Sequence, residues 1–194
     1  MNKIKTGIFS GSFNPIHIGH LALANYLIEF EGLDELWFIV TPQNPLKPKH
    51  SLLDDKMRIK MVQLAIEGYP RFSVNDIESN LPQPNYTVRT LEALDEKYPE
   101  REFHLIIGAD NWEIFDKWAE HEKIKNNYHI IVYPRRGHDI LIAESETRVK
   151  ATDAPLIEVS STFIRQSVAQ NKDIRFFTPL SVYEFIYDNK LYRN

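Results

Sequence analysis

The stretch Gly7 to His20 reads GIFSGSFNPIHIGH and predicts the end of a strand, a glycine-bearing turn and the start of a helix. It overlaps a short apolar run, Ile4 to Phe9, and precedes Leu21 to Ile28, whose length and apolar repeat are typical of a helix. A turn between the first strand and the first helix is where open α/β sheets bind phosphate, because the helix directs its dipole and free amides into the crevice. His17 and His20 lie three residues apart, so both imidazoles can reach one anionic group.

Two common phosphate loops are absent from this stretch. It matches neither the dinucleotide fingerprint G-x-G-x-x-G nor the loop G-x-x-x-x-G-K-[ST]. A histidine pair by itself also fits an ordinary helix start, so the pair needs support from the rest of the chain.

Length and composition bound the remaining possibilities. The chain has 194 residues, with 43% hydrophobic and 26% charged residues, which predicts one domain over residues 1–194, with residues 171–194 as a helical appendage. A net charge of -4 argues against a nucleic-acid partner, and the absence of cysteine excludes disulfides, thiolate catalysis and cysteine zinc sites. No apolar run reaches membrane-spanning length, so we expect no membrane partner and a cytoplasmic location.

Apolar runs alternate with helical patterns along most of the chain, which predicts a parallel sheet with right-handed crossovers. The expected strands are 4–9, 35–40, a third through Phe72 and Val74 that could reach Ile77, 102–107, 129–132 and a last one at 156–159. The expected helices are 21–28, 54–67, 88–97 with Asn85 or Thr87 as cap, 160–170 and 181–188. The polar segment 144–153 is expected to be exposed.

Other candidate ligand groups lie where expected strands end. Gly108 follows the central strand and allows a ligand to approach the backbone, and Asp110 can accept hydrogen bonds from ribose hydroxyls. Ser160 to Arg165 forms a second strand-to-helix junction, whose first-turn amides and arginine could hold a polyphosphate. The proline-rich loop 42–50 carries Lys47 and is either a solvated linker or a phosphate-binding loop over the crevice.

Two motifs give the chain a family resemblance. Gly11, Phe13, Pro15, His17, Gly19 and His20 match the signature G-x-F-x-P-x-H-x-G-H of the nucleotidylyltransferases, and Ser160 to Arg165 match S-S-T-x-I-R. With Asn44 to Lys47, Tyr86, Thr87, Gly108, Asp110 and Trp118, the chain resembles the bacterial nicotinate mononucleotide adenylyltransferases along nearly its whole length. The resemblance implies a Rossmann-like, doubly wound α/β fold of the nucleotidylyltransferase type. It also implies transfer of the adenylyl group of ATP to nicotinate mononucleotide, which yields nicotinate adenine dinucleotide and pyrophosphate.

The resemblance also implies roles for individual residues. His17, His20, Lys47 and Arg165 would be the catalytic groups, acting as fixed cations on the phosphates. ATP would be bound by Gly11, Ser12, Phe13, His17, His20, Gly108, Asp110, Ser161, Thr162 and Arg165. Nicotinate mononucleotide would be bound by Asn44, Lys47, Tyr86, Thr87, Trp118 and Arg135. The chain departs from the family at Asn14, which is often aspartate, and at Lys47, which stands in place of a histidine.

The implied chemistry is electrostatic. The 5′-phosphate of the mononucleotide is already an anionic nucleophile, so cations and positioning are needed rather than a strong base. We expect Mg²⁺ to be held by the nucleotide and water, with no metal ligands from the protein.

Related activities stay open. A nicotinamide mononucleotide or phosphopantetheine adenylyltransferase shares the chemistry, and a non-catalytic nucleotide-binding protein could share the fold. A class I aminoacyl-tRNA synthetase also carries HIGH, but it needs further domains and a KMSKS loop, where this chain has KMRIK at 56–60. A homo-oligomer is left open.

Overall fold

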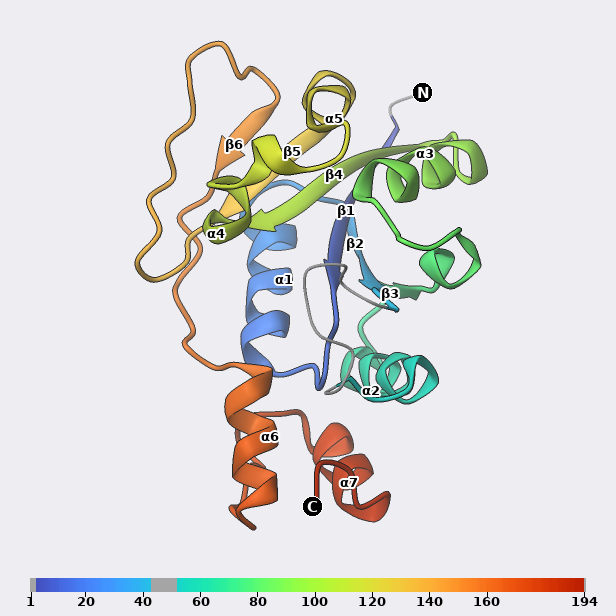
Figure 1. Cartoon of the computed structure of the whole chain (residues 1–194), viewed down its shortest axis with the longest axis vertical. Coiled ribbons are helices and arrows are strands. Elements are labelled where there is room, and N and C mark those ends of the chain that lie inside the picture. Colours follow the sequence, from blue (N-terminus) through green and yellow to red (C-terminus); the bar gives the residue numbers. More distant parts are fainter. Residues whose placement is uncertain (1–2, 43–51, 194) are drawn as a thin grey trace.

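The computed structural model describes residues 3–42 and 52–193, which form a six-stranded parallel sheet flanked by helices (Figure 1). The strands are β1 (Ile4–Gly11), β2 (Glu35–Val40), β3 (Phe72–Asn75), β4 (Arg101–Gly108), β5 (His129–Tyr133) and β6 (Val149–Ala151). Their order in the sheet is β3-β2-β1-β4-β5-β6, and every pairing is parallel. The sequence prediction of a doubly wound α/β sheet is confirmed.

Within the described ranges, seven helices and two short 3-10 helices accompany the strands, and the last two helices follow the last strand. They are α1 (Ile18–Phe30), α2 (Asp55–Ile66), η2 (Ile77–Asn80), α3 (Thr87–Lys97), α4 (Ala109–Trp112), η3 (Phe115–Lys117), α5 (His121–Asn127), α6 (Ser161–Ala169) and α7 (Leu180–Asp188).

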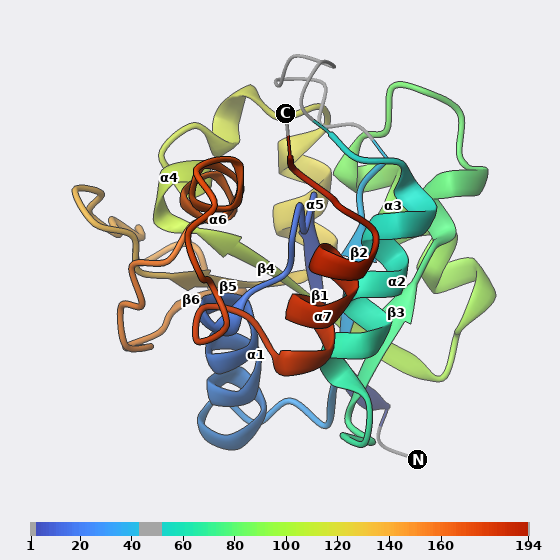
Figure 2. The same ribbon diagram turned by 90° about the horizontal axis from the view of Figure 1, so that it is seen from below.

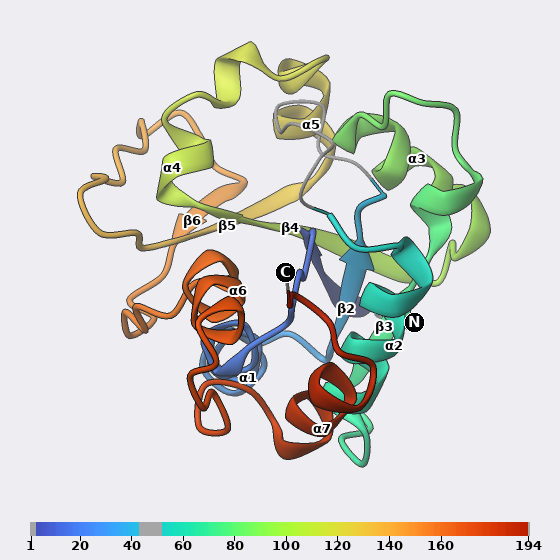
Figure 3. The same cartoon turned by 60° about the horizontal axis from the view of Figure 1, so that its bottom comes forward.

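The central strands are buried on both faces, as parallel strands between helical layers must be. On one face, Phe9 of β1 lies opposite Phe38 and Ile106 and belongs to a core shared with α1, α2, α6 and α7. On the other face, Ile8 and Leu105 belong to a second core shared with α3 and α5. Figure 3 shows the sheet between these two sets of helices.

The carboxyl-terminal helix α7 packs on α2 rather than standing apart (Figure 2). Val182 and Ile186 are fully buried, and the Ser181 hydroxyl donates to the Leu64 carbonyl at 2.9 Å. Leu191, just beyond α7, belongs to the same core.

The expected last strand at 156–159 is wrong. This segment has no regular structure, and Leu156 and Ile157 are 54% and 39% exposed. The sixth strand is β6, inside the polar segment 144–153 that was expected to be exposed, and it pairs through Ile131 opposite Lys150. An edge strand of three residues is paired on one side only, so it needs little apolar character.

Two smaller expectations also differ from the structure. β3 ends at Asn75, and Ile77 begins a 3-10 helix because its N–H donates to the Asn75 side chain at 2.9 Å. The cap residue of α3 is Tyr86, not Asn85 or Thr87. The side chain of Asn85 donates instead to the Glu78 carbonyl at 2.9 Å.

Among the described residues, the helices are all too short or too polar to cross a membrane.

Candidate active site

His17 and His20 form a stacked imidazole pair at the start of α1. His17 is the extended residue before the helix and His20 lies in its first turn. The ring centroids are 3.7 Å apart with an interplanar angle of 27°. The backbone N–H of His17 donates to His20 Nδ1 at 3.3 Å. Phe9 and Phe13 pack edge-on against the His20 ring, so the pair is held in one orientation.

The surroundings of both imidazoles favour their neutral form in the ligand-free protein. Burial, and secondarily the positive charge of Arg135, lowers the pKa of His17 to about 4. Burial, then His17 and Arg135, lowers the pKa of His20 well below its usual value. The expected cationic role of the two imidazoles concerns the complex with ATP and stays a prediction. Neutral imidazoles can still donate a hydrogen bond to a phosphate oxygen, and a bound polyanion favours their protonation.

Asp110 and Arg135 lie together at the carboxyl ends of β4 and β5. The carboxylate oxygen Oδ1 of Asp110 is 3.8 Å from Nε of Arg135 and, within the described ranges, is buried without a hydrogen-bond donor. Arg135 Nη2 donates to the Tyr133 hydroxyl at 2.8 Å. A Cβ atom on Gly108 would collide with Asp110 Oδ1 and lie 3.1 Å from Arg135 Nε, so this glycine leaves room for the pair. The positive charge of Arg135 also lowers the pKa of both histidines. The Phe9 ring contacts the His20 ring and the Tyr133 ring, with centroids 6.0 and 6.1 Å away, so these groups lie near one another.

The second predicted junction contacts the first. Ser160 caps α6 by accepting from the Phe163 N–H at 3.1 Å. The Ser161 hydroxyl donates to the Pro15 carbonyl at 2.8 Å, and Arg165 Nη1 donates to the Asn14 carbonyl at 2.8 Å. Two motifs about 150 residues apart in sequence thus meet beside the imidazole pair. Ser161 and Arg165 thus hold the turn, and Thr162 is exposed and accepts from Arg165 Nη2 at 3.3 Å.

The residues expected around the pyridine ring come from the opposite face of the sheet. Tyr86 is 37% exposed at the start of α3, with the Arg89 guanidinium 5.4 Å from its ring centre. Thr87 is the first residue of α3. Trp118 follows η3 and packs against Phe115, with ring centroids 5.1 Å apart. Asn44 and Lys47 lie outside the described residues.

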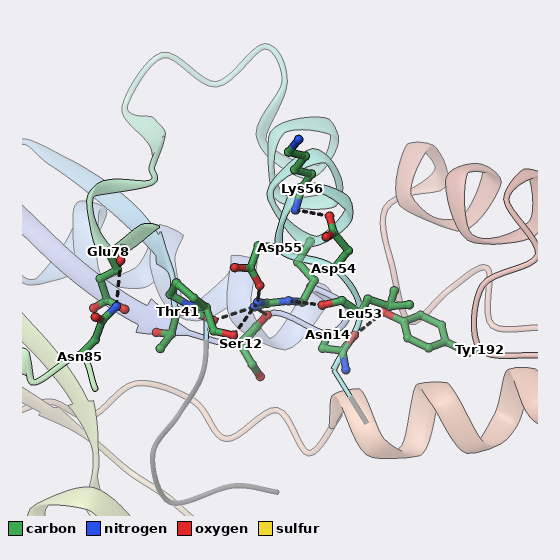
Figure 4. A network of polar contacts seen from close by, with 12 residues as sticks. Ser12, Asn14, Thr41, Leu53, Asp54, Asp55, Lys56, Glu78, Asn85 and Tyr192 are labelled. Atoms are coloured by element: carbon green, nitrogen blue, oxygen red, sulfur yellow. Dashed lines mark hydrogen bonds and ion pairs between the residues drawn. The ribbon is translucent and has the colours of Figure 1, made fainter. Parts of the chain in front are cut away.

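Sequence reasoning missed Arg58, which holds the backbone around the site. Arg58 is fully buried and donates to the carbonyls of Ser12 at 2.6 Å, Thr41 at 2.9 Å and Leu53 at 3.0 Å. It also forms an ion pair with Asp55. These acceptors converge from the ends of β1 and β2 and from the start of α2 (Figure 4). The helical spacing could have predicted its burial. Arg58 precedes the buried Met61 and Val62 of α2 by three and four residues and so shares their face.

Sequence reasoning also missed a buried polar cluster formed by Glu78, Asn85 and Thr90. Glu78 is 4% exposed, and its carboxylate accepts from the Thr90 hydroxyl at 2.9 Å. Burial raises the pKa of Glu78. Together with the bond from Asn85 to the Glu78 carbonyl, this cluster ties the loop before α3 to η2. Its members are separated by turn residues, and no periodic pattern marks them.

A protein-family model described as cytidylyltransferase-like matches residues 8–167, which span both junctions. The chain belongs to this family. Within it, the chain is 59% identical to a probable nicotinate-nucleotide adenylyltransferase of Bacteroides fragilis, over 96% of this chain and 92% of the relative. It is 48% identical to a protein of the same name from Flavobacterium johnsoniae, over 98% of this chain and all of that one. These relatives show that this cytidylyltransferase-like chain is a member of the nicotinate-nucleotide adenylyltransferases.

The solved structures confirm the fold of the family member. The Plasmodium falciparum nicotinic acid mononucleotide adenylyltransferase complexed with NaAD superimposes with a TM-score of 0.79, over 97% of each chain and at 21% identity. A putative nicotinate-nucleotide adenylyltransferase from Vibrio parahaemolyticus gives a TM-score of 0.72 at 25% identity, over 98% of this chain and 96% of the other.

Proposed function

We propose that this chain transfers the adenylyl group of ATP to nicotinate mononucleotide and releases pyrophosphate. The observation that carries the proposal is the junction of the two motifs, in which Arg165 and Ser161 bind the turn that leads into His17 and His20. The names of the two relatives support the choice of the mononucleotide.

In this proposal the triphosphate lies between the starts of α1 and α6. His17 and His20 donate hydrogen bonds to its oxygens, and Arg165 supplies a fixed positive charge near the leaving pyrophosphate. Thr162 and Ser161, in the first turn of α6, add hydroxyl groups and the positive end of the helix dipole. Gly11, Ser12 and Phe13 line the nucleotide at the end of β1, and Gly108 and Asp110 receive the ribose.

The mononucleotide approaches from the side of α3. In this proposal Arg135 binds its phosphate, and Tyr86, Thr87 and Trp118 surround the pyridine ring and its carboxylate. Asn44 and Lys47 are proposed to complete this side. The attacking phosphate oxygen already carries charge, so the protein has to align it with the α-phosphorus and balance the repulsion between two anions.

Magnesium is proposed to enter with ATP. The described part of the chain contains no group of three or more histidine and carboxylate side chains that could hold a metal ion. The proposal is that phosphate oxygens and water hold the ion. When bound, Mg²⁺ would neutralise charge on the phosphates.

The test is a side-by-side assay of pyrophosphate release from ATP with nicotinate mononucleotide, nicotinamide mononucleotide and phosphopantetheine. We expect the nicotinate substrate to give the highest kcat/KM and nicotinate adenine dinucleotide as product. A higher kcat/KM with either other acceptor would overturn the substrate assignment. Absence of pyrophosphate release with all three would overturn catalysis.

A further inference from the structure

The turn that connects β1 to α1 is held by hydrogen bonds from distant parts of the chain. The Ser12 carbonyl accepts from Arg58 of α2, the Asn14 carbonyl from Arg165 of α6, and the Pro15 carbonyl from Ser161. Because this turn ends at His17, its orientation determines where the two imidazoles lie. Groups that fix the turn therefore act on the site without touching a substrate.

The end of the chain supplies one more donor to the same turn. The Tyr192 hydroxyl donates to Asn14 Oδ1 at 2.8 Å (Figure 4). Asn14 is 1% exposed, and the neighbouring Leu191 is 9% exposed and belongs to the core next to α7. This is the contact by which the last residues of the chain, beyond α7, reach the turn.

The Tyr192 hydroxyl is a persistent donor. Burial raises its pKa above the usual value, and the positive charges of Arg165 and Arg58 act in the opposite direction. Tyr192 has a positive φ of 58°, a conformation that a tyrosine adopts only where its surroundings hold it. The packing of Leu191 into the core provides such a hold.

We infer that Tyr192 is a positioning residue for adenylyl transfer, which fixes the Asn14 turn and thereby the imidazole pair on ATP. The inference rests on the proposed function. It assigns to the carboxyl-terminal segment a part in the ATP site, although no residue of that segment is proposed to contact a substrate.

The test compares Tyr192→Phe with Tyr187→Phe. Tyr187 is a matched control, because it also lies near the carboxyl end and its hydroxyl donates to a backbone carbonyl, that of Lys172, at 2.9 Å and at the surface. Each variant loses one oxygen atom. Affinity for α,β-methylene ATP is measured by calorimetry in the absence of the second substrate, and kcat and both KM values are then measured.

We expect Tyr192→Phe to weaken binding of the analogue and to lower kcat/KM for ATP by about fivefold, the effect of one neutral hydrogen bond. The KM for nicotinate mononucleotide should stay within about twofold, and Tyr187→Phe should match the wild type. In an Asn14→Ala background, Tyr192→Phe should have no further effect on ATP binding, because the partner is already gone.

Unchanged ATP constants in Tyr192→Phe would overturn the inference. So would a fall in melting temperature with loss of active protein but no change in either KM, since that is a purely structural role. Because the analogue is bound without the second substrate, a failure of the proposed function appears as a wild type that binds ATP but does not use nicotinate mononucleotide. In that case, the affinities of the wild type and of Tyr192→Phe for the analogue still decide whether Tyr192 positions the ATP site.

Discussion

Replacing Arg58 by methionine should strongly destabilise this protein. The guanidinium is fully buried and joins the ends of β1 and β2 to the start of α2. Methionine keeps most of the apolar length of the side chain but removes every donor. The carbonyls of Ser12, Thr41 and Leu53 then lose their buried partner, while Asp55, whose side chain is 40% exposed, can still be solvated.

The magnitude follows from these contacts. A hydrogen bond that involves a charged group contributes about 1.5–3 kcal/mol, and three such bonds at 3.0 Å or less are lost. Water entering the gap and relaxation of the loops reduce the sum, as for other broken buried ion pairs, to about 3–5 kcal/mol. A loss of this size is a large share of the stability of a typical domain, about 5–15 kcal/mol.

Urea unfolding followed by circular dichroism measures this loss. The control is Lys60→Met, an exposed position on the same helix, which should change the free energy of unfolding by less than about 0.5 kcal/mol. A loss below about 1 kcal/mol for Arg58→Met, with the control unchanged, would refute the reasoning that Arg58 holds these three segments together.

Three further predictions follow from the site. His20→Ala should lower kcat by roughly a hundredfold with little change in melting temperature, whereas His129→Ala, at the amino end of β5, should keep its activity; equal activity of both variants would contradict the role of His20. Gly108→Ala should displace Asp110 and raise the KM for ATP by about tenfold, measured with nicotinate mononucleotide saturating; an unchanged KM would contradict the role of Asp110. His17 has a pKa of about 4 when folded and about 6.5 when unfolded, so between these values the unfolded chain binds the extra proton and acid destabilises the fold. From pH 7 to pH 5 the wild type should lose about 2 kcal/mol more than His17→Asn in urea titrations; equal losses would show that burial does not lower this pKa.

The sequence was sufficient to predict the central part of the fold. The strands β1, β2, β4 and β5 each contain a run of apolar residues because helices cover them on both faces, and such runs are visible without a structure. The edge strand β6 was missed for the opposite reason. Its residues Val149 to Ala151 are polar or partly exposed, and the more apolar segment that includes Leu156 and Ile157 crosses the surface without a strand partner.

The site could be predicted in part. The spacing of His17 and His20 and the serines that open α6 mark helix starts, which local patterns reveal. The bond from Arg165 to Asn14 and the contact of Tyr192 with the same turn join residues more than 150 positions apart, and no local pattern encodes them. The lowered pKa values of the imidazoles also depend on burial, which only the folded structure shows.

A crystal structure of the protein with α,β-methylene ATP tests the central claim most directly, because the claim is that one triphosphate is held by both junctions. The account predicts phosphate oxygens within about 3 Å of an imidazole nitrogen of the His17 and His20 pair and of the Arg165 guanidinium in the same complex. A triphosphate bound at only one of these junctions, or elsewhere on the sheet, would contradict it.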